Sequence, residues 1–173
     1  MSSNTPSRTA DLYARSLGQR GLQSTHDMII GRLDALTSVA ELDEFGVFVW
    51  GDGLIPESNA SRTAPGQRIN GFVEEFRRWA TTAGVVIEPF FPSERANSKN
   101  RDEEWTHLRV PTMTLAEYED GALQFVSHCL DGDIVITVLD RLDTLEARAF
   151  SQPHTTRRIA EVDQIQTAHS NDG

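Results

Sequence analysis

Phe45-Gly46-Val47-Phe48-Val49-Trp50 is a short, apolar stretch made of residues that favour β-strands. Because nearly every position is apolar, it predicts a strand buried on both faces, as in a parallel sheet. Apolar residues at helical spacing precede it and predict a helix over residues 25–39. Residues 11–17 predict a strand before that helix. A strand, a helix and a second strand in this order imply a right-handed crossover between parallel strands.

The rest of the chain extends this pattern into a mixed sheet. Pro65 opens a second helix with a clear apolar stripe, and Gly84 is placed to end it. Asp120-Gly121 and Asp131-Gly132-Asp133 mark turns. The order β-α-β-α-β-β-β-α follows, which predicts an α/β fold with a mixed sheet and helices on both faces. Further strands are predicted at 85–91, 105–118 and 122–126, the last helix at 138–149, and loops at 51–64 and 92–100.

Two helix starts carry a capping-box pattern in which aspartate replaces the usual glutamate. Ser24 stands three residues before Asp27, and Thr137 stands three residues before Asp140. Each pattern predicts that the hydroxyl and the carboxylate satisfy free backbone N–H groups in the first turn.

The charge balance is strongly acidic. The chain carries 26 acidic residues against 15 arginines and one lysine, Lys99, and its formal net charge is −10. This acid load, with arginine in place of lysine, is typical of soluble proteins of salt-saturated cytoplasms, where carboxylates hold water and counter-ions. Most carboxylates are therefore expected to serve hydration rather than a reaction. Residues 61–101 are the exception, with seven bases against four acids.

Length and composition predict one domain with tails. Residues 1–9 are expected to be disordered, residues 10–149 to form a single α/β domain, and residues 150–173 to form a polar tail. The sequence has no apolar run of the ~20 residues that a membrane span needs, and its start lacks the apolar stretch of a secretory signal. The single cysteine, Cys129, excludes an intrachain disulfide and a cysteine-cluster zinc site. A cytoplasmic location is therefore expected.

Val110-Pro111-Thr112, followed by Tyr118-Glu119-Asp120-Gly121-Ala122-Leu123, resembles the proline-containing strand and hairpin of thioredoxin-like proteins. The element order is similar as well. The resemblance implies a cis peptide bond before Pro111 and places the redox motif in the loop 18–24. That loop contains no cysteine, so the resemblance implies a thioredoxin-like scaffold without redox activity.

A second set of motifs extends across the core: Arg15-Ser16-Leu17, Val49-Trp50-Gly51, Arg62-Thr63, Val73-Glu74-Glu75-Phe76, Glu88-Pro89-Phe90-Phe91 and Asp140-Arg141-Leu142. Together these motifs resemble a family of uncharacterised small proteins of salt-loving archaea. Some of its members bear a helix-turn-helix label, which implies a regulatory role. A helix-turn-helix needs two helices joined by a turn of about 3–4 residues. The first two predicted helices are instead separated by a strand and a long loop.

Ligands of open α/β sheets bind beyond the carboxyl ends of parallel strands. Here those ends are the loops 18–24 and 51–64, and each leads into a helix N-terminus, which attracts anions. Arg62 is the strongest candidate for holding a phosphate or a carboxylate. Helix capping and ordinary solvation explain the same residues without a ligand. The candidate anion- or ligand-binding residues are Arg20, Gln23, Ser24, Arg62, Thr63 and Pro111.

The second helix offers a nucleic-acid alternative. Together with Arg62, the arginines Arg68, Arg77 and Arg78 would form the exposed basic face of a DNA-associated regulator. The competing interpretation is pairing within the helix, because glutamates stand three or four residues before Arg77 and Arg78.

No strong catalytic motif is present. The sequence lacks the HExxH, P-loop, dinucleotide and nucleophile-elbow signatures. His107 and His128 could face one another across the predicted meander, with Cys129 nearby, and form a metal or catalytic pair. A lone cysteine flanking a strand is more often a buried core residue than part of a functional site. No cofactor and no metal is expected. The sequence predicts a non-catalytic regulatory module that binds a protein partner or a small anion. The alternatives are a DNA-associated transcriptional regulator and an enzyme on a redox-inactive thioredoxin-like scaffold.

Overall fold

The computed structural model describes residues 5–16, 21–51, 53–54, 64–97 and 104–151. None of the helices in these ranges is long and apolar enough to cross a membrane. The elements, in chain order, are β1 (Arg8–Ala14), α1 (Gln23–Ser38), β2 (Glu44–Val49), β3 (Gly53–Leu54), α2 (Ala64–Ala83), β4 (Ser93–Asn97), β5 (Glu104–Arg109), β6 (Met113–Glu119), β7 (Ala122–Ser127), β8 (Cys129–Asp131), β9 (Ile134–Ile136) and α3 (Val138–Ser151).

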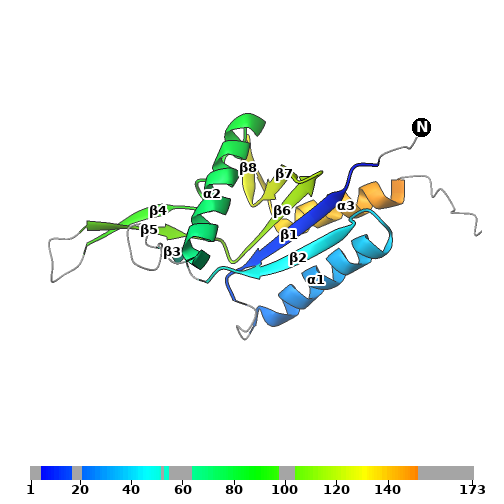
Figure 1. The fold of residues 1–173 in the computed structure, drawn as a ribbon, viewed down its shortest axis with the longest axis horizontal. Helices are drawn as coiled ribbons and strands as arrows, with labels where there is room; N and C mark the ends of the chain where they lie inside the picture. The colour runs from blue at the N-terminus through cyan, green and yellow to red at the C-terminus, as the bar shows by residue number, and fades with distance from the viewer. Residues whose placement is uncertain (1–4, 17–20, 52, 55–63, 98–103, 152–173) are drawn as a thin grey trace, which may run out of the picture.

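The centre of the fold is a four-stranded sheet in the order β2-β1-β6-β7 (Figure 1). β1 and β2 run parallel, with Asp11 paired to Gly46, whereas β6 runs antiparallel to both β1 and β7. The predicted mixed α/β fold is therefore confirmed. Two smaller sheets accompany it, one in the order β3-β5-β4 and one made of β8 and β9.

Helices cover the two faces of the central sheet because alternate strand residues point to opposite sides. Leu12 and Leu115 face α1 and α3 and share a buried cluster with them. Their neighbours Tyr13 and Ala116 face the other way, into a cluster with α2. Figure 1 shows the hairpin of β4 and β5 extending away from this body.

The parallel pairing of β2 is confirmed, but its expected burial is wrong. β2 is the outermost strand of the sheet. Val47, Phe48 and Val49 are 37%, 41% and 57% exposed. A continuous apolar pattern does not show whether a strand lies at the centre or at the edge of a sheet, because an apolar edge strand has the same pattern of residues as a buried central strand.

The predicted strand at 85–91 is also wrong. Residues 88–90 form a turn, in which the N–H of Phe90 donates to the carbonyl of Ile87 at 2.9 Å. Val86 makes only an isolated bridge to Leu130. Ile87 and Phe91 are buried beside α2. These apolar residues therefore pack in the core and do not form a hydrogen-bonded strand. A strand, β4, instead lies within the predicted loop 92–100, and β3 lies within the predicted loop 51–64.

The two capping boxes have opposite outcomes. At α3, the N–H of Asp140 donates to Thr137 Oγ1 at 3.2 Å, and the N–H of Thr137 donates to Asp140 Oδ2 at 2.8 Å. The Thr137 hydroxyl also donates to Asp140 Oδ2 at 2.6 Å. This hydrogen bond, together with the one from the Thr137 N–H, holds the pKa of Asp140 below its ordinary value. The prediction for Ser24 is wrong, because α1 begins at Gln23 with Leu22 at its N-cap and without a side-chain cap.

Candidate functional site

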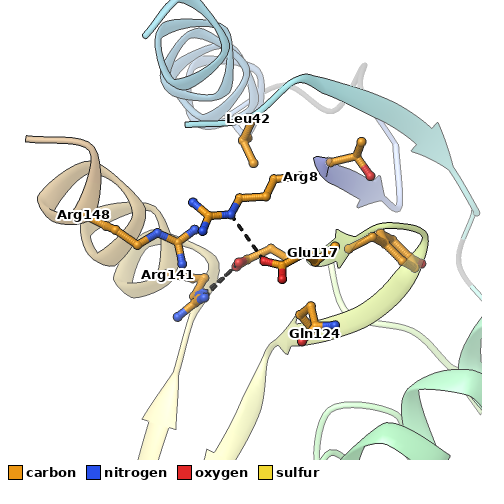
Figure 2. A pocket seen from close by; sticks show the side chains of 9 residues that line it. Arg8, Leu42, Glu117, Gln124, Arg141 and Arg148 are labelled. Atoms are coloured by element: carbon orange, nitrogen blue, oxygen red, sulfur yellow. Dashed lines mark hydrogen bonds and ion pairs between the residues drawn. The ribbon is translucent and has the colours of Figure 1, made fainter. Parts of the chain in front are cut away.

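A hollow of about 250 Å³ opens where the start of β1, the end of β6 and α3 meet (Figure 2). We call it the arginine pocket, because three arginines from two elements converge on it. Figure 2 shows their guanidinium groups lying close to one another and to Glu117. The pocket is lined by Arg8, Thr9, Leu42, Glu117, Tyr118, Glu119, Gln124, Arg141 and Arg148.

Two buried glutamates hold these arginines in place. Glu117 is 6% exposed, and its carboxylate accepts from Nε and Nη2 of Arg141 at 2.5 and 2.9 Å. Glu41 is 3% exposed and accepts from Nε of Arg148 and from Nη1 of Arg8, the latter at 3.4 Å. Buried carboxylates need such partners, because removing one leaves an uncompensated charge that costs about 3–5 kcal/mol.

Local sequence places these side chains. Arg141 and Arg148 stand seven residues apart on α3, which puts them on one side of the helix, two turns apart. Glu117 lies two residues after Leu115 on β6 and therefore points to the face that α3 covers. The guanidinium of Arg141 also lies 4.1 Å from the ring centre of Phe125, a cation–π contact that fixes its plane.

The arginine pocket keeps donors that its glutamates do not use. Nε of Arg8 reaches Glu119 only at 3.4 Å, and the Glu119 side chain is 42% exposed. The terminal nitrogens of Arg148 have no hydrogen-bond partner within the described ranges. The pocket thus combines rigidly anchored guanidinium groups with free N–H groups, which suits carboxylate or phosphate oxygens.

A second hollow, of about 390 Å³, lies beside β2 and has a different character. We call it the edge groove. A Cβ at Gly46 would come within 2.9 Å of Asp11 Oδ1 and 2.7 Å of the Phe48 ring, so glycine leaves the room that both side chains occupy. The edge groove is lined by Thr9, Ala10, Asp11, Glu44, Phe45, Gly46, Phe48, Tyr118 and Gly121.

The electrostatics of the edge groove are acidic. Burial raises the pKa of Asp11 above its ordinary value, the Tyr13 hydroxyl opposes this by donating to Oδ2 at 3.4 Å, and the nearby Glu44 and Glu75 add to the increase. Burial also raises the pKa of Tyr118 to about 12. Asp11 has no cationic partner among the described side chains.

Comparison with known proteins gives one match. A family model described as a helix-turn-helix domain matches residues 2–150. The chain belongs to this family. No curated protein and no solved structure matches it.

In the described part of this helix-turn-helix family member, α1 and α3 contact one another through the ion pairs of Arg32 with Asp143 and Glu146, but they are not consecutive helices. β2 and β3 lie between α1 and α2, and β4 to β9 lie between α2 and α3. Within the described ranges, consecutive helices are therefore not joined by the short turn that gives the motif its name. The apolar faces of all three helices pack on the central sheet instead.

The predicted anion site of the family member is only partly described. Arg20, Arg62 and Thr63 lie outside the described residues. Gln23 and Ser24 are exposed in the first turn of α1. Neither of them lines the arginine pocket or the edge groove.

Pro111 is half-buried between β5 and β6 and lines neither hollow. Arg15 holds this connection, because its Nη2 donates to the Val110 carbonyl at 2.6 Å and its N–H donates to the Thr112 carbonyl at 2.9 Å. Among the described residues, the cis peptide bond joins Ser127 and His128. The bond before Pro111 is therefore trans, and the cis bond that the thioredoxin-like resemblance implies is absent.

The arginines on α2 do not form one uniform face. Arg68 and Arg78 are exposed, and Arg62 lies outside the described residues. The predicted pair of Glu74 with Arg77 is confirmed at 2.9 Å. The predicted pairs of Arg78 with the preceding glutamates are wrong, since no ion pair of Arg78 forms within the described ranges.

His107 and His128 do not form the pair that their sequence positions allow. His107 lies on β5 in the three-stranded sheet, whereas His128 lies between β7 and β8. Cys129 is fully buried, and burial raises the pKa of its thiol to about 11. In the described part of the family member, no group of three or more His, Cys, Asp or Glu side chains could hold a metal ion.

Sequence reasoning missed the residues of the arginine pocket. Arg8 stands 33 positions before Glu41, and Glu41 stands 76 positions before Glu117. Their meeting depends on strand order, which no local pattern encodes. The only usable signal was the seven-residue spacing of Arg141 and Arg148 beside the apolar stripe of α3.

Proposed function

We propose that this helix-turn-helix family member is a non-catalytic regulatory module that binds a small anion in the arginine pocket. One observation carries the proposal. Three guanidinium groups converge on a hollow of about 250 Å³, and two buried glutamates anchor them. The volume lies just below the range of about 300–1,000 Å³ that is usual for small-molecule sites, which favours an anion the size of phosphate or a short dicarboxylate.

The anchoring of the guanidinium groups supports anion binding, because it removes much of the entropic cost of binding. A guanidinium group already held by a buried carboxylate loses little side-chain freedom when it meets a ligand. Arg148 is the main contributor to binding. Its Nε binds Glu41, and its terminal nitrogens have no hydrogen-bond partner among the described residues. Arg148 also lines the pocket, so these nitrogens are available to an anion. Its side chain is 39% exposed, so an anion reaches it from solvent.

Glu119 is the internal competitor of such an anion. It is the most exposed of the pocket's glutamates and makes only the 3.4 Å contact to Arg8. An incoming anion displaces this weak contact at little cost, because exposed ion pairs contribute about 0–1 kcal/mol. Neutralising Glu119 should therefore strengthen binding rather than weaken it.

The test is isothermal titration with inorganic phosphate and with succinate at a fixed KCl concentration. Wild type should bind at least one of them, Arg148→Gln should bind at least tenfold more weakly, and Glu119→Gln should bind more tightly. Arg77→Gln, which removes a surface arginine of α2, is the matched control and should leave affinity unchanged. Equal affinity in all four proteins would refute the proposal.

Family membership favours a second candidate, a DNA-associated regulator. Arg68 and Arg78 are the exposed arginines of α2 that support it, while the net charge of −10 opposes binding to phosphate backbones. A gel-shift assay with duplex DNA, in moderate and in molar KCl, tests it. Loss of a complex in Arg68→Gln/Arg78→Gln would favour this candidate, and absence of any complex would remove it.

We also infer a salt-rich cytoplasmic setting and a thioredoxin-like ancestry for the scaffold. The excess of 26 acidic residues over 16 basic ones supports the salt-rich setting. The element order of a βαβ unit, a helix, a hairpin and a final helix supports the thioredoxin-like scaffold. A free energy of unfolding that rises steadily up to molar KCl is expected, and a fall with added KCl would contradict the salt-rich setting.

A further inference from the structure

β2 is an apolar edge strand without the residues that usually keep an exposed edge from pairing with another chain. It ends the sheet order, and no strand of the described chain pairs with its outer side. Val47, Phe48 and Val49 are exposed along it. The strand contains neither lysine nor proline, the residues that commonly keep an edge from pairing. Such an edge is a template for an added strand.

The two faces of β2 differ in chemistry. Val47 and Val49 share a face with Phe45, which packs against the buried cluster under α1. The opposite face carries Glu44 and opens into the edge groove. A strand added beside β2 would therefore meet valines on one face, and the Phe48 ring together with carboxylates on the other.

The Phe48 ring and the Asp11 carboxylate meet over Gly46. Asp11 and Gly46 are paired in register across β1 and β2, and a Cβ at Gly46 would come within 2.9 Å of Asp11 Oδ1 and 2.7 Å of the Phe48 ring. Neighbouring strands lie about 4.8 Å apart, so Asp11 lies about two such spacings from an added strand. The side chain of a lysine or an arginine opposite Gly46 can span that distance and reach the Asp11 carboxylate, with Glu44 alongside.

We propose that the outer edge of β2 binds an extended segment of a partner protein in which apolar and basic residues alternate. The apolar residues lie beside Val47 and Val49, and the basic residues extend along the exposed Phe48 ring toward Asp11 and Glu44. Cross-strand pairs of both kinds stabilise a sheet. The edge groove shares Thr9 and Tyr118 with the arginine pocket. β2, Asp11 and Gly46 do not line that pocket, so this proposal stands without the proposed function.

Charge selects this occupant over a second copy of the chain. A second β2 would bring Glu44 and no basic residue. If a two-fold axis continued the sheet, both edge grooves would lie on the same face. That arrangement sets acidic groups against acidic groups, and each copy carries a net charge of −10. A basic segment instead supplies the cation that Asp11 lacks among the described residues.

The experiment uses the full chain and a labelled peptide of four valine-lysine repeats, measured by fluorescence anisotropy. A peptide of the same composition in the order Val-Val-Lys-Lys, repeated twice, has the same charge without the alternation. Asp11→Asn/Glu44→Gln removes two charges from the edge groove. Asp131→Asn/Asp133→Asn, at the exposed turn between β8 and β9, removes two charges elsewhere and is the matched control.

The alternating peptide should bind saturably and about tenfold more tightly than the blocked peptide. Its affinity should fall by about tenfold in the Asp11→Asn/Glu44→Gln variant and stay within about twofold in the control variant, given two cross-strand charge pairs. Equal binding of both peptides, or equal losses in both variants, would reduce the effect to general charge attraction and overturn the proposal. A dimer of the chain in analytical ultracentrifugation that Phe48→Lys abolishes would overturn it as well, in favour of a second copy.

Discussion

Replacing Arg141 with methionine should leave the Glu117 carboxylate buried without its bidentate partner. Glu117 is 6% exposed, and the Arg141 side chain is 18% exposed, so the pair is close to fully desolvated. Breaking a buried pair by removing one partner costs about 3–5 kcal/mol. The loss of the contact with Phe125 adds about 0.5–1 kcal/mol. We expect the lower part of the summed range, about 3.5–4.5 kcal/mol, because Arg141 retains some solvent contact.

Urea unfolding monitored by circular dichroism measures this loss, and thermal unfolding should show a midpoint lower by about 7–18 °C. The matched control is Arg77→Met, whose partner Glu74 is 65% exposed and whose loss should cost about 0–1 kcal/mol. Adding Glu117→Met to Arg141→Met should recover most of the stability, because an apolar pair replaces a buried ionic one at little cost. A loss no larger than that of Arg77→Met, or a double variant less stable than the single one, would refute the reasoning.

Three further predictions concern other parts of the molecule. The pKa of Asp11 is raised in the folded protein, so its ionised form opposes folding. Asp11→Asn should therefore raise the thermal midpoint at pH 7. This gain should vanish as the pH falls below 3.8, the ordinary pKa of an aspartate, because the wild-type side chain is then protonated in both states. Cys129 should react with Ellman's reagent at pH 8 at least about a hundredfold more slowly in the folded protein than in urea, because its pKa of about 11 and its burial suppress the thiolate. Thr137→Ala should lower the free energy of unfolding by about 1 kcal/mol in a urea titration, because it removes the cap of α3, and an unchanged midpoint would contradict that role.

The fold class was predictable because the strongest local signals were also the correct ones. The apolar stripe of residues 65–84 became α2, and the capping box at Thr137 became the start of α3. The parallel pairing of β1 and β2 followed from the βαβ order. These features depend on neighbours within a few residues, which a single sequence contains.

The failures share a physical cause, which is that burial is decided by tertiary contacts. The apolar stretch at 85–91 packs as a turn in the core, and the apolar β2 lies at the edge of the sheet. The arginine pocket depends on the order β1-β6 in the sheet and on the placement of α3 behind it. Neither arrangement is encoded in the spacing of Arg8, Glu41 and Glu117 along the chain.

The binding claim is tested most directly by the ¹⁵N resonances of the arginine Nε–H groups during a titration with inorganic phosphate at constant KCl. Arginine variants assign the signals. The account predicts that the signals of Arg8 and Arg148 move saturably with one shared dissociation constant, while that of Arg77 stays in place. Signals that all move together without saturation, or that do not move at all, would contradict it.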